Sequence, residues 1–229
     1  MTSRMTRART HDGATADRVL AAIGVLAGIL TIVGLSGVGD APAPQAEARL
    51  IADHFQLVRT DVFIGAIFGM VGVAAMTTFA LGLALRLSRR GERAAALAVG
   101  AGLTLVVAYL LATHVVYATL SYEVAAMSDD VTKGMFVATI LAVPVFGLGV
   151  ATLLVGSAVG SWRDAVMPRW WVITTCAAAT LSLVAMFCYA ENGFFSPDVQ
   201  QQVVADVLIV WLAMTSVVYA VRSPHRVRS

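Results

Sequence analysis

The chain has 229 residues, of which 59% are hydrophobic and 13% are charged, and its mean hydropathy is +0.80. Soluble domains carry about 25% charged residues, so this composition excludes an ordinary soluble protein. The formal net charge is +2, and the arginines are scattered without a basic stripe or interleaved aromatic residues, which argues against nucleic acid as a partner.

Apolar runs close to the roughly 20 residues that a bilayer-spanning helix needs account for most of the chain. The predicted spans are about 19–38, 61–85, 94–117, 135–159, 171–190 and 203–221. Little sequence remains outside them, so we expect one membrane domain over residues 19–221, with polar tails at 1–18 and 222–229. The expected fold is an all-α, six-transmembrane-helix bundle.

The first run, Val19–Val38, is followed by Ala41-Pro42-Ala43-Pro44, which resembles the small-residue region at which a signal peptide is cleaved. The run is longer than the roughly 7–15 apolar residues of a signal peptide, so we expect an uncleaved first span. Cleavage would instead leave five spans and a mature amino terminus outside the cell.

The segment between the first two spans predicts a short amphipathic helix over Gln45–Val58. Pro42 and Pro44 break any helix before it. Its apolar residues recur at helical spacing, opposite a charged face. The apolar face consists of Leu50, Ile51, Phe55 and Val58, and the charged face of Glu47, Arg49 and Asp53. We expect this helix to lie on the outer side of the membrane, at the interface with water.

Basic residues predict the orientation of the spans. With the amino terminus inside, all basic residues except Arg49, Arg59 and Lys133 lie on the cytoplasmic side. The positive-inside rule therefore predicts that both termini are cytoplasmic. Lys133 is the only lysine, and we interpret the excess of arginine as the codon bias of a GC-rich genome. The predicted location is the plasma membrane of a bacterium.

Small residues spaced four apart predict close packing between spans, because lipid offers little hydrophobic gain for helix association. Three spans carry such glycine pairs, at Gly24/Gly28, Gly65/Gly69 and Gly156/Gly160. We expect these pairs to make contacts within the chain. Pro144 predicts a kink in the fourth span, because it removes a backbone donor.

Polar and ionisable side chains gather at the predicted outer ends of the spans, where they form a candidate outer polar cluster. Its members are Arg59, Asp61, His114, Tyr117, Glu191 and Asp206. Helix-face arithmetic predicts that Asp61 and Asp206 point into the bundle, Asp206 lying opposite the bulky Trp211. Arg59 is then placed to pair with Asp61 or Asp206.

This cluster has two interpretations. In the first it lines a shallow pocket open to the outside, where His114 titrates or binds a metal. In the second it is a collar of paired interfacial charges that sets helix depth, and we prefer the collar. One histidine within a span is too few for a metal site, which needs three or four ligands. His54 and Glu191 complete such a set only if the loop folds over the bundle, so we predict no metal and no cofactor.

The passage His54–Gly69 (HFQLVRTDVFIGAIFG) carries an arginine and then an aspartate at the entrance of the second span, at Arg59 and Asp61. In this it resembles six-span integral membrane proteins of unassigned function that are common in actinobacteria. The resemblance implies a six-helix bundle in the plasma membrane and implies no activity.

Three functions are open from the sequence, in decreasing order of support. The first is a non-enzymatic accessory or scaffold component, whose partners are the lipid bilayer and other membrane subunits. The second is a transporter or channel for a small solute or ion, with Asp61 and Asp206 at an outward-facing polar vestibule. The third is a membrane enzyme with an extracytoplasmic site of His114 and carboxylates.

Overall fold

A computed structural model describes residues 2–39, 41–123, 126–162, 167–190 and 193–222. Within these residues the regular secondary structure is entirely helical, which confirms the all-α prediction. The helices are α1 (Thr2–Ser36), α2 (Ala48–Leu57), α3 (Arg59–Arg89), α4 (Arg93–Glu123), α5 (Asp129–Leu141), α6 (Val143–Ser161), α7 (Arg169–Val184) and α8 (Pro197–Arg222), with a 3₁₀ turn at Ala185–Phe187.

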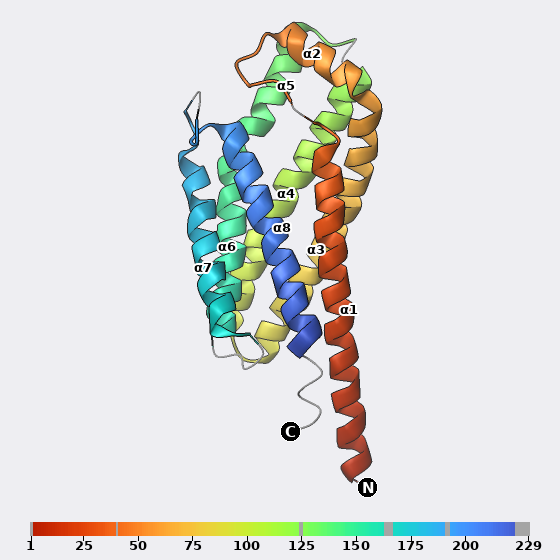
Figure 1. The fold of residues 1–229 in the computed structure, drawn as a ribbon, viewed down its shortest axis with the longest axis vertical. Coiled ribbons are helices and arrows are strands. Elements are labelled where there is room, and N and C mark those ends of the chain that lie inside the picture. The colour runs from red at the N-terminus through yellow and green to blue at the C-terminus, as the bar shows by residue number, and fades with distance from the viewer. Residues whose placement is uncertain (1, 40, 124–125, 163–166, 191–192, 223–229) are drawn as a thin grey trace.

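Six helical segments in the described residues are long and apolar enough to cross a bilayer, as predicted. The fourth is made of α5 and α6 together, and α2 is the short helix between the first two. α1 begins at Thr2, so the helix continues through the segment predicted as a polar tail and extends beyond the bundle (Figure 1).

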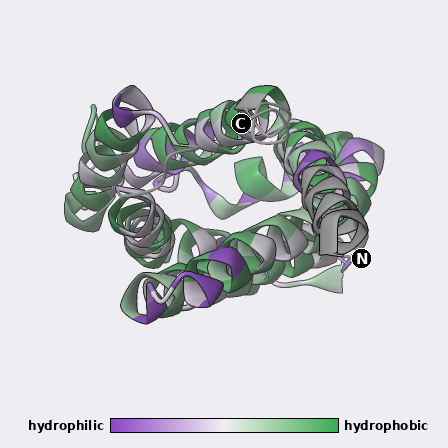
Figure 2. Ribbon diagram, turned by 90° about the horizontal axis from the view of Figure 1, so that it is seen from below, coloured by the Kyte–Doolittle hydropathy of each residue, from purple (hydrophilic) through white to green (hydrophobic). Residues whose placement is uncertain are grey.

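The long helices run side by side, and α2 lies across one end of them (Figure 1). We call this the α2 end, and we call the opposite end, where α1 begins and α8 ends, the terminal end. Seen from the terminal end, hydrophobic residues predominate along the helices (Figure 2). Many large apolar side chains are exposed on the outside, including Ile67, Leu97 and Val159, as a lipid-facing surface requires.

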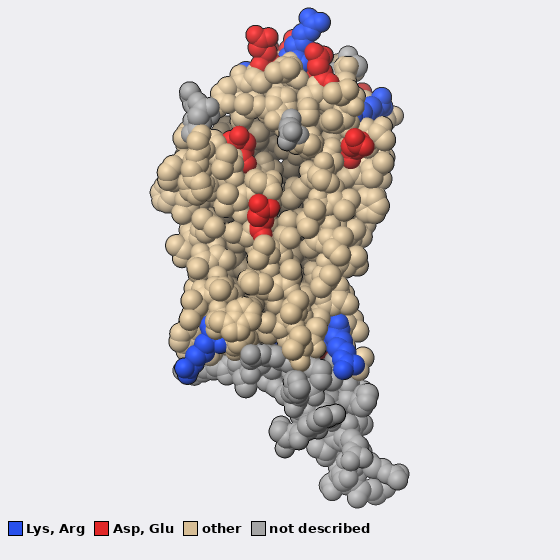
Figure 3. Space-filling view, in the orientation of Figure 1, with Lys and Arg blue, Asp and Glu red and all other residues tan. Residues whose placement is uncertain are grey.

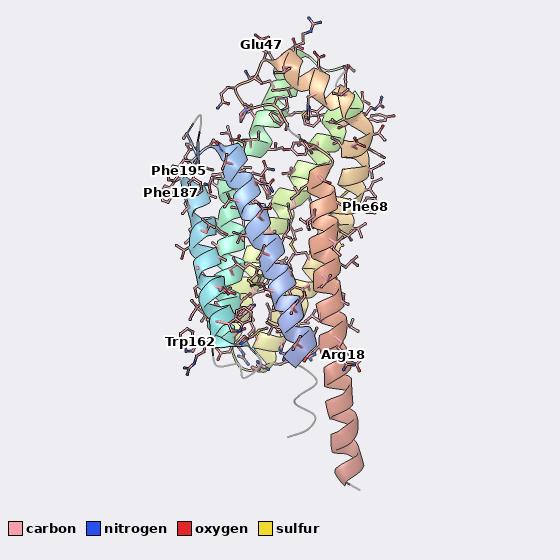
Figure 4. The ribbon with its side chains drawn as sticks, in the orientation of Figure 1. Arg18, Glu47, Phe68, Trp162, Phe187 and Phe195 are labelled. Atoms are coloured by element: carbon pink, nitrogen blue, oxygen red, sulfur yellow. The ribbon has the colours of Figure 1, made fainter. Side chains whose placement is uncertain are left out.

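Charged and aromatic residues mark two levels on the bundle. A wide band without exposed charges separates basic residues near the terminal end from a mixed group at the α2 end (Figure 3). Trp162 is exposed near the terminal end, and Phe187 and Phe195 are exposed towards the other end, well short of Glu47 (Figure 4). Aromatic residues favour the two interfaces of a bilayer, so these levels indicate where the apolar band begins and ends.

One ion pair joins α1 to α3 at the terminal end. Arg86 Nη1 lies 2.6 Å from Asp17 Oδ1, and its guanidinium group also lies 4.7 Å from the ring centroid of Tyr219 on α8. A single arginine therefore ties three helices together at the edge of the apolar band.

Glycines bring helix backbones into direct contact along two seams. On α1 and α3, a Cβ built on Gly34 would lie 2.6 Å from the Cα of Gly69, and one on Gly65 would lie 2.9 Å from the Gly34 oxygen. On α4 and α6, a Cβ on Gly102 would strike the backbone of Leu153 and Gly149. Only hydrogen fits at these positions.

The predicted glycine pairs make contacts within the chain, with one exception. Gly65 faces α1, and Gly69 contacts Gly34 of α1 and His114 of α4. Gly156 faces α4, and Gly160 faces α4 and Leu87 at the end of α3. Gly24 lies under Ser216 of α8 and Phe79 of α3, but Gly28 has nothing within 4 Å of its Cβ direction.

Pro144 divides the fourth span, as predicted. α5 ends at Leu141, Ala142 forms a turn, and α6 starts again at Val143 with the proline in its first turn. The Val145 N–H donates to the Ala142 carbonyl at 3.0 Å, which is the tight pattern of a restarted helix. The break lets α5 follow α2 while α6 stays packed on α4.

The α4–α6 seam predicts that Gly102→Ala destabilises the bundle by about 1–3 kcal/mol, because the added methyl group must push two backbones apart. Gly100→Ala is a matched control on the same helix, since its Cβ would meet nothing within 4 Å. Thermal unfolding in detergent should show a lower midpoint for Gly102→Ala alone. Equal midpoints for the two variants would contradict the seam.

Candidate functional site

A partly open cavity of about 190 Å³ lies at the α2 end, lined by residues of α1, α3, α4, α5 and α8 and of the chain just after α1. α1 and α8 pack together at Gly24 and Ser216 near the terminal end and diverge towards the α2 end, and the cavity lies where they part (Figure 1). Its polar lining residues are Thr113, His114, Tyr117, Asp198, Gln201 and Gln202. Its apolar lining residues include Leu35, Val38, Val62, Ala66, Phe136, Ile140 and Ala205.

His114 extends from α4 into the junction with α1 and α3 and is only 5% exposed. Its Nδ1 lies 2.6 Å from the Leu110 carbonyl oxygen, one turn back on the same helix. A carbonyl only accepts, so Nδ1 carries the proton and donates it. In the neutral ring Nε2 is then an acceptor, and it has no hydrogen-bond partner among the described residues.

The ring of His114 lies directly over Gly69 of α3. A Cβ built on Gly69 would collide with Nε2 and Cδ2 of the imidazole. Gly69 therefore serves both the α1–α3 seam and the placement of the histidine, because only hydrogen leaves room for the ring.

Tyr117 lies one turn further along α4, with its hydroxyl beside the side chains of Thr139 and Gln201. Its ring packs 5.6 Å from Phe55 and 6.4 Å from Phe136, centroid to centroid. Phe55 and Phe136 are themselves 5.8 Å apart, edge to face. This aromatic trio joins α2, α4 and α5, and it fixes two walls of the cavity.

α2 is held to the bundle by Ile51 and Phe55, which are both fully buried, and by a polar clamp. The Nε2–H of His54 donates to the Val38 carbonyl at 2.9 Å, since that oxygen can only accept. The clamp fixes the chain just beyond α1, where Val38, Gly39 and Ala41 line the cavity. Gly39 has φ +59°, a left-handed conformation that suits glycine.

The structure brings together only part of the candidate outer polar cluster. His114 and Tyr117 line the cavity, as the pocket interpretation expects. Arg59 lies instead over the ring of Tyr122, 5.2 Å from its centroid, and makes no ion pair with Asp61 or Asp206 in the described part of the chain. The predicted arginine–aspartate pairing is therefore wrong. Glu191 lies outside the described residues.

The prediction that Asp61 points into the bundle is wrong, because its side chain is exposed. The close packing of the chain at the end of α1 against α3 explains this outcome. A Cβ on Gly37 would lie 2.5 Å from the Asp61 backbone oxygen, so α1 packs directly on the backbone there. No room is left between the helices for a carboxylate, and it turns to the outside.

The prediction for Asp206 is wrong for a different reason. Trp211, which lies opposite Asp206 on α8, is 1% exposed and packs edge to face on Phe79 at 6.0 Å. The large indole takes the inner face together with Leu208 and Leu212. Asp206 then lies on the outer face, where it accepts a hydrogen bond from Gln202 Nε2 at 2.9 Å.

The sequence reasoning missed the contribution of α8 to the cavity. Asp198, Gln201 and Gln202 are lining residues, and none of them was a candidate. The sequence did contain an indication of this contribution, because Gln200–Gln202 is a run of amides directly before an apolar span. Uncharged amides attract less notice than charges, although they supply both donors and acceptors.

Among the described residues no group of three or more His, Cys, Asp or Glu side chains is arranged to hold a metal ion. No protein-family model, no curated protein and no solved structure matches the chain.

The aromatic trio predicts that Phe55→Ala undocks α2, because truncating a buried phenylalanine costs about 3–5 kcal/mol. We expect the amides of residues 48–57 to exchange with deuterium at least about tenfold faster. Leu57→Ala, on the same helix but 85% exposed, is the control and should leave exchange unchanged. Unchanged exchange in Phe55→Ala would show that α2 is held by other contacts.

Proposed function

We propose that this protein is a non-enzymatic accessory or scaffold subunit of the bacterial plasma membrane, with both termini in the cytoplasm and the α2 end outside. The charge distribution supports this orientation. Arg86, Arg89, Arg90 and Arg93 lie together at the terminal end, whereas acidic residues gather towards the α2 end (Figure 3). Cytoplasmic loops carry the excess of arginine and lysine.

A polar stripe on α8 is the observation that supports a subunit role. Asp198, Gln202 and Asp206 follow one another at every fourth residue, so they share one helix face, and all three side chains are exposed. Asp206 lies nine residues after Pro197, about 14 Å along the helix, and the next exposed residue on that face, Val210, is apolar.

An exposed carboxylate at this depth is costly in lipid. Insertion of an aspartate at the centre of a span costs about 2.5–3.5 kcal/mol, and less nearer the interface. Gln202 offsets part of this cost for Asp206. A neighbouring helix that donates a hydrogen bond or carries a positive charge would offset the rest, which makes the polar stripe a docking surface for another membrane protein.

The partner in this proposal is a different chain and not a second copy. A two-fold symmetric dimer through the polar stripe would place the same surface on both sides of the interface. Asp206 would then approach the partner's Asp206 in a medium of low dielectric, which is unfavourable unless one of them is protonated.

The other functions have less support. A transporter is favoured by the cavity, but below it the core is filled by large side chains, including Tyr109 stacked on Phe146 at 4.6 Å. Transporters place polar binding groups near the bilayer midplane. An enzyme that uses His114 with Asp61 or Asp206 is disfavoured because both carboxylates are exposed on the outside of the bundle, which leaves Asp198 as the one carboxylate among the described lining residues.

A photo-crosslinking residue at Val210 tests the subunit role, because Val210 is exposed one turn beyond Asp206 on the same face. In membranes of the native host we expect one discrete adduct with another membrane protein, reduced at least about fivefold in Asp206→Leu. The same crosslinker at Ile173, exposed on α7, is the control. Lipid adducts alone, or a dimer of this chain, would contradict the proposal.

Cysteine labelling tests the orientation. In a background with Cys176 and Cys188 replaced by serine, Gln56→Cys on α2 and Ser88→Cys near the terminal end are compared. We expect a membrane-impermeant maleimide added to whole cells to label position 56 only. Labelling of position 88 without lysis would reverse the topology.

A further inference from the structure

We propose that the cavity at the α2 end binds a small uncharged polyol, held by hydrogen bonds to Tyr117 and Gln201. The cavity of about 190 Å³ far exceeds the roughly 10–15 Å³ that one water molecule requires, so it has room for several non-hydrogen atoms. Its position at the meeting point of several helices is typical of ligand sites in helical bundles.

The polar groups on the wall suit hydroxyl groups. His114 lines the wall but offers the ligand no free ring nitrogen, because Nδ1 donates to Leu110 and Nε2 lies against Gly69. The Tyr117 and Thr113 hydroxyls and the Gln201 amide each offer a donor and an acceptor. A hydroxyl also donates and accepts, so each of these groups can be paired by a polyol without leaving a polar atom unmatched.

The charges of the lining residues disfavour a charged ligand, whether an anion or a cation. No lysine or arginine occurs among the described lining residues, so an anion would enter without a counter-charge. Asp198 is the one carboxylate among them, and its side chain is exposed in the first turn of α8. There it already compensates the positive end of the helix dipole, so it does not call for a cation in the cavity.

The wall is built before any ligand arrives. The Phe55–Tyr117–Phe136 trio fixes the phenol, Gly69 fixes the imidazole, and the His54 clamp fixes the chain at Val38. Such preorganisation removes much of the entropic cost of binding. Asp198 and Gln202 belong both to the cavity lining and to the polar stripe, whereas Tyr117 and Gln201 belong to the cavity alone, so a variant at Gln201 tests this site separately from the subunit role.

Saturation-transfer NMR on the purified full chain in nanodiscs tests this site, because it detects weak ligands. The probes are erythritol as the neutral polyol, ethanolammonium as the cation and acetate as the anion. We expect a saturable signal from erythritol only. Gln201→Leu removes one hydrogen-bonding group at similar volume and should weaken binding about tenfold. Ala205→Phe, which fills the cavity from α8, should abolish it.

Gln56→Leu, an exposed amide on α2 outside the cavity, is the matched control and should bind erythritol as the parent does. Unfolding midpoints close to the parent's establish that each variant is folded. If Ala205→Phe does not fold, Gln201→Leu alone tests the site. The proposal is overturned if erythritol gives no saturable signal, if its signal persists unchanged in Gln201→Leu, or if ethanolammonium or acetate binds as well.

Discussion

Close backbone contact between helices is the constraint on which the rest of this structure depends. Lipid tails are as apolar as leucine, so spans associate through dispersion and polar contacts at short range. Glycines allow the helix backbones to approach this closely along the α1–α3 and α4–α6 seams. α8 contains no glycine, and Gly24 of α1 lies under its Ser216 near the terminal end. Towards the α2 end the two helices part, and the cavity is the space that this divergence leaves.

The α2 end is held by a different force. Ile51 and Phe55 are fully buried there, beside charged residues that mark a watery environment, so ordinary hydrophobic burial stabilises the docking of α2. The break at Pro144 makes this possible, because α5 follows α2 through Phe136 while α6 remains on the α4 seam. The cavity therefore lies between two regions that are held together by different interactions. Below it, helices are fixed by glycine contacts, and above it by aromatic packing and the His54 clamp.

Local sequence features were enough for three predictions, because each depends on a short stretch of sequence. Hydropathy predicted the six apolar helices, the proline predicted the break at Pro144, and glycine spacing predicted most of the glycine contacts. The orientations of the side chains in the site were harder to predict. His114 and Tyr117 were identified because they lie near the end of an apolar run. Asp61 and Asp206 were assigned to the wrong faces, since a helix face is set by its neighbours. A glycine seam left Asp61 no space, and the buried Trp211 turned Asp206 outward.

The part played by α8 also has a consequence for biogenesis. Membrane helices leave the ribosome in chain order, so α1 to α7 can enter the bilayer before α8 exists. Until α8 arrives, the Tyr117 hydroxyl lacks the Gln201 side chain beside it, and the side of the cavity that α8 forms is open to lipid. Unpaired polar groups are costly there. The nascent chain therefore exposes a polar group to lipid until α8, its last described helix, closes the cavity.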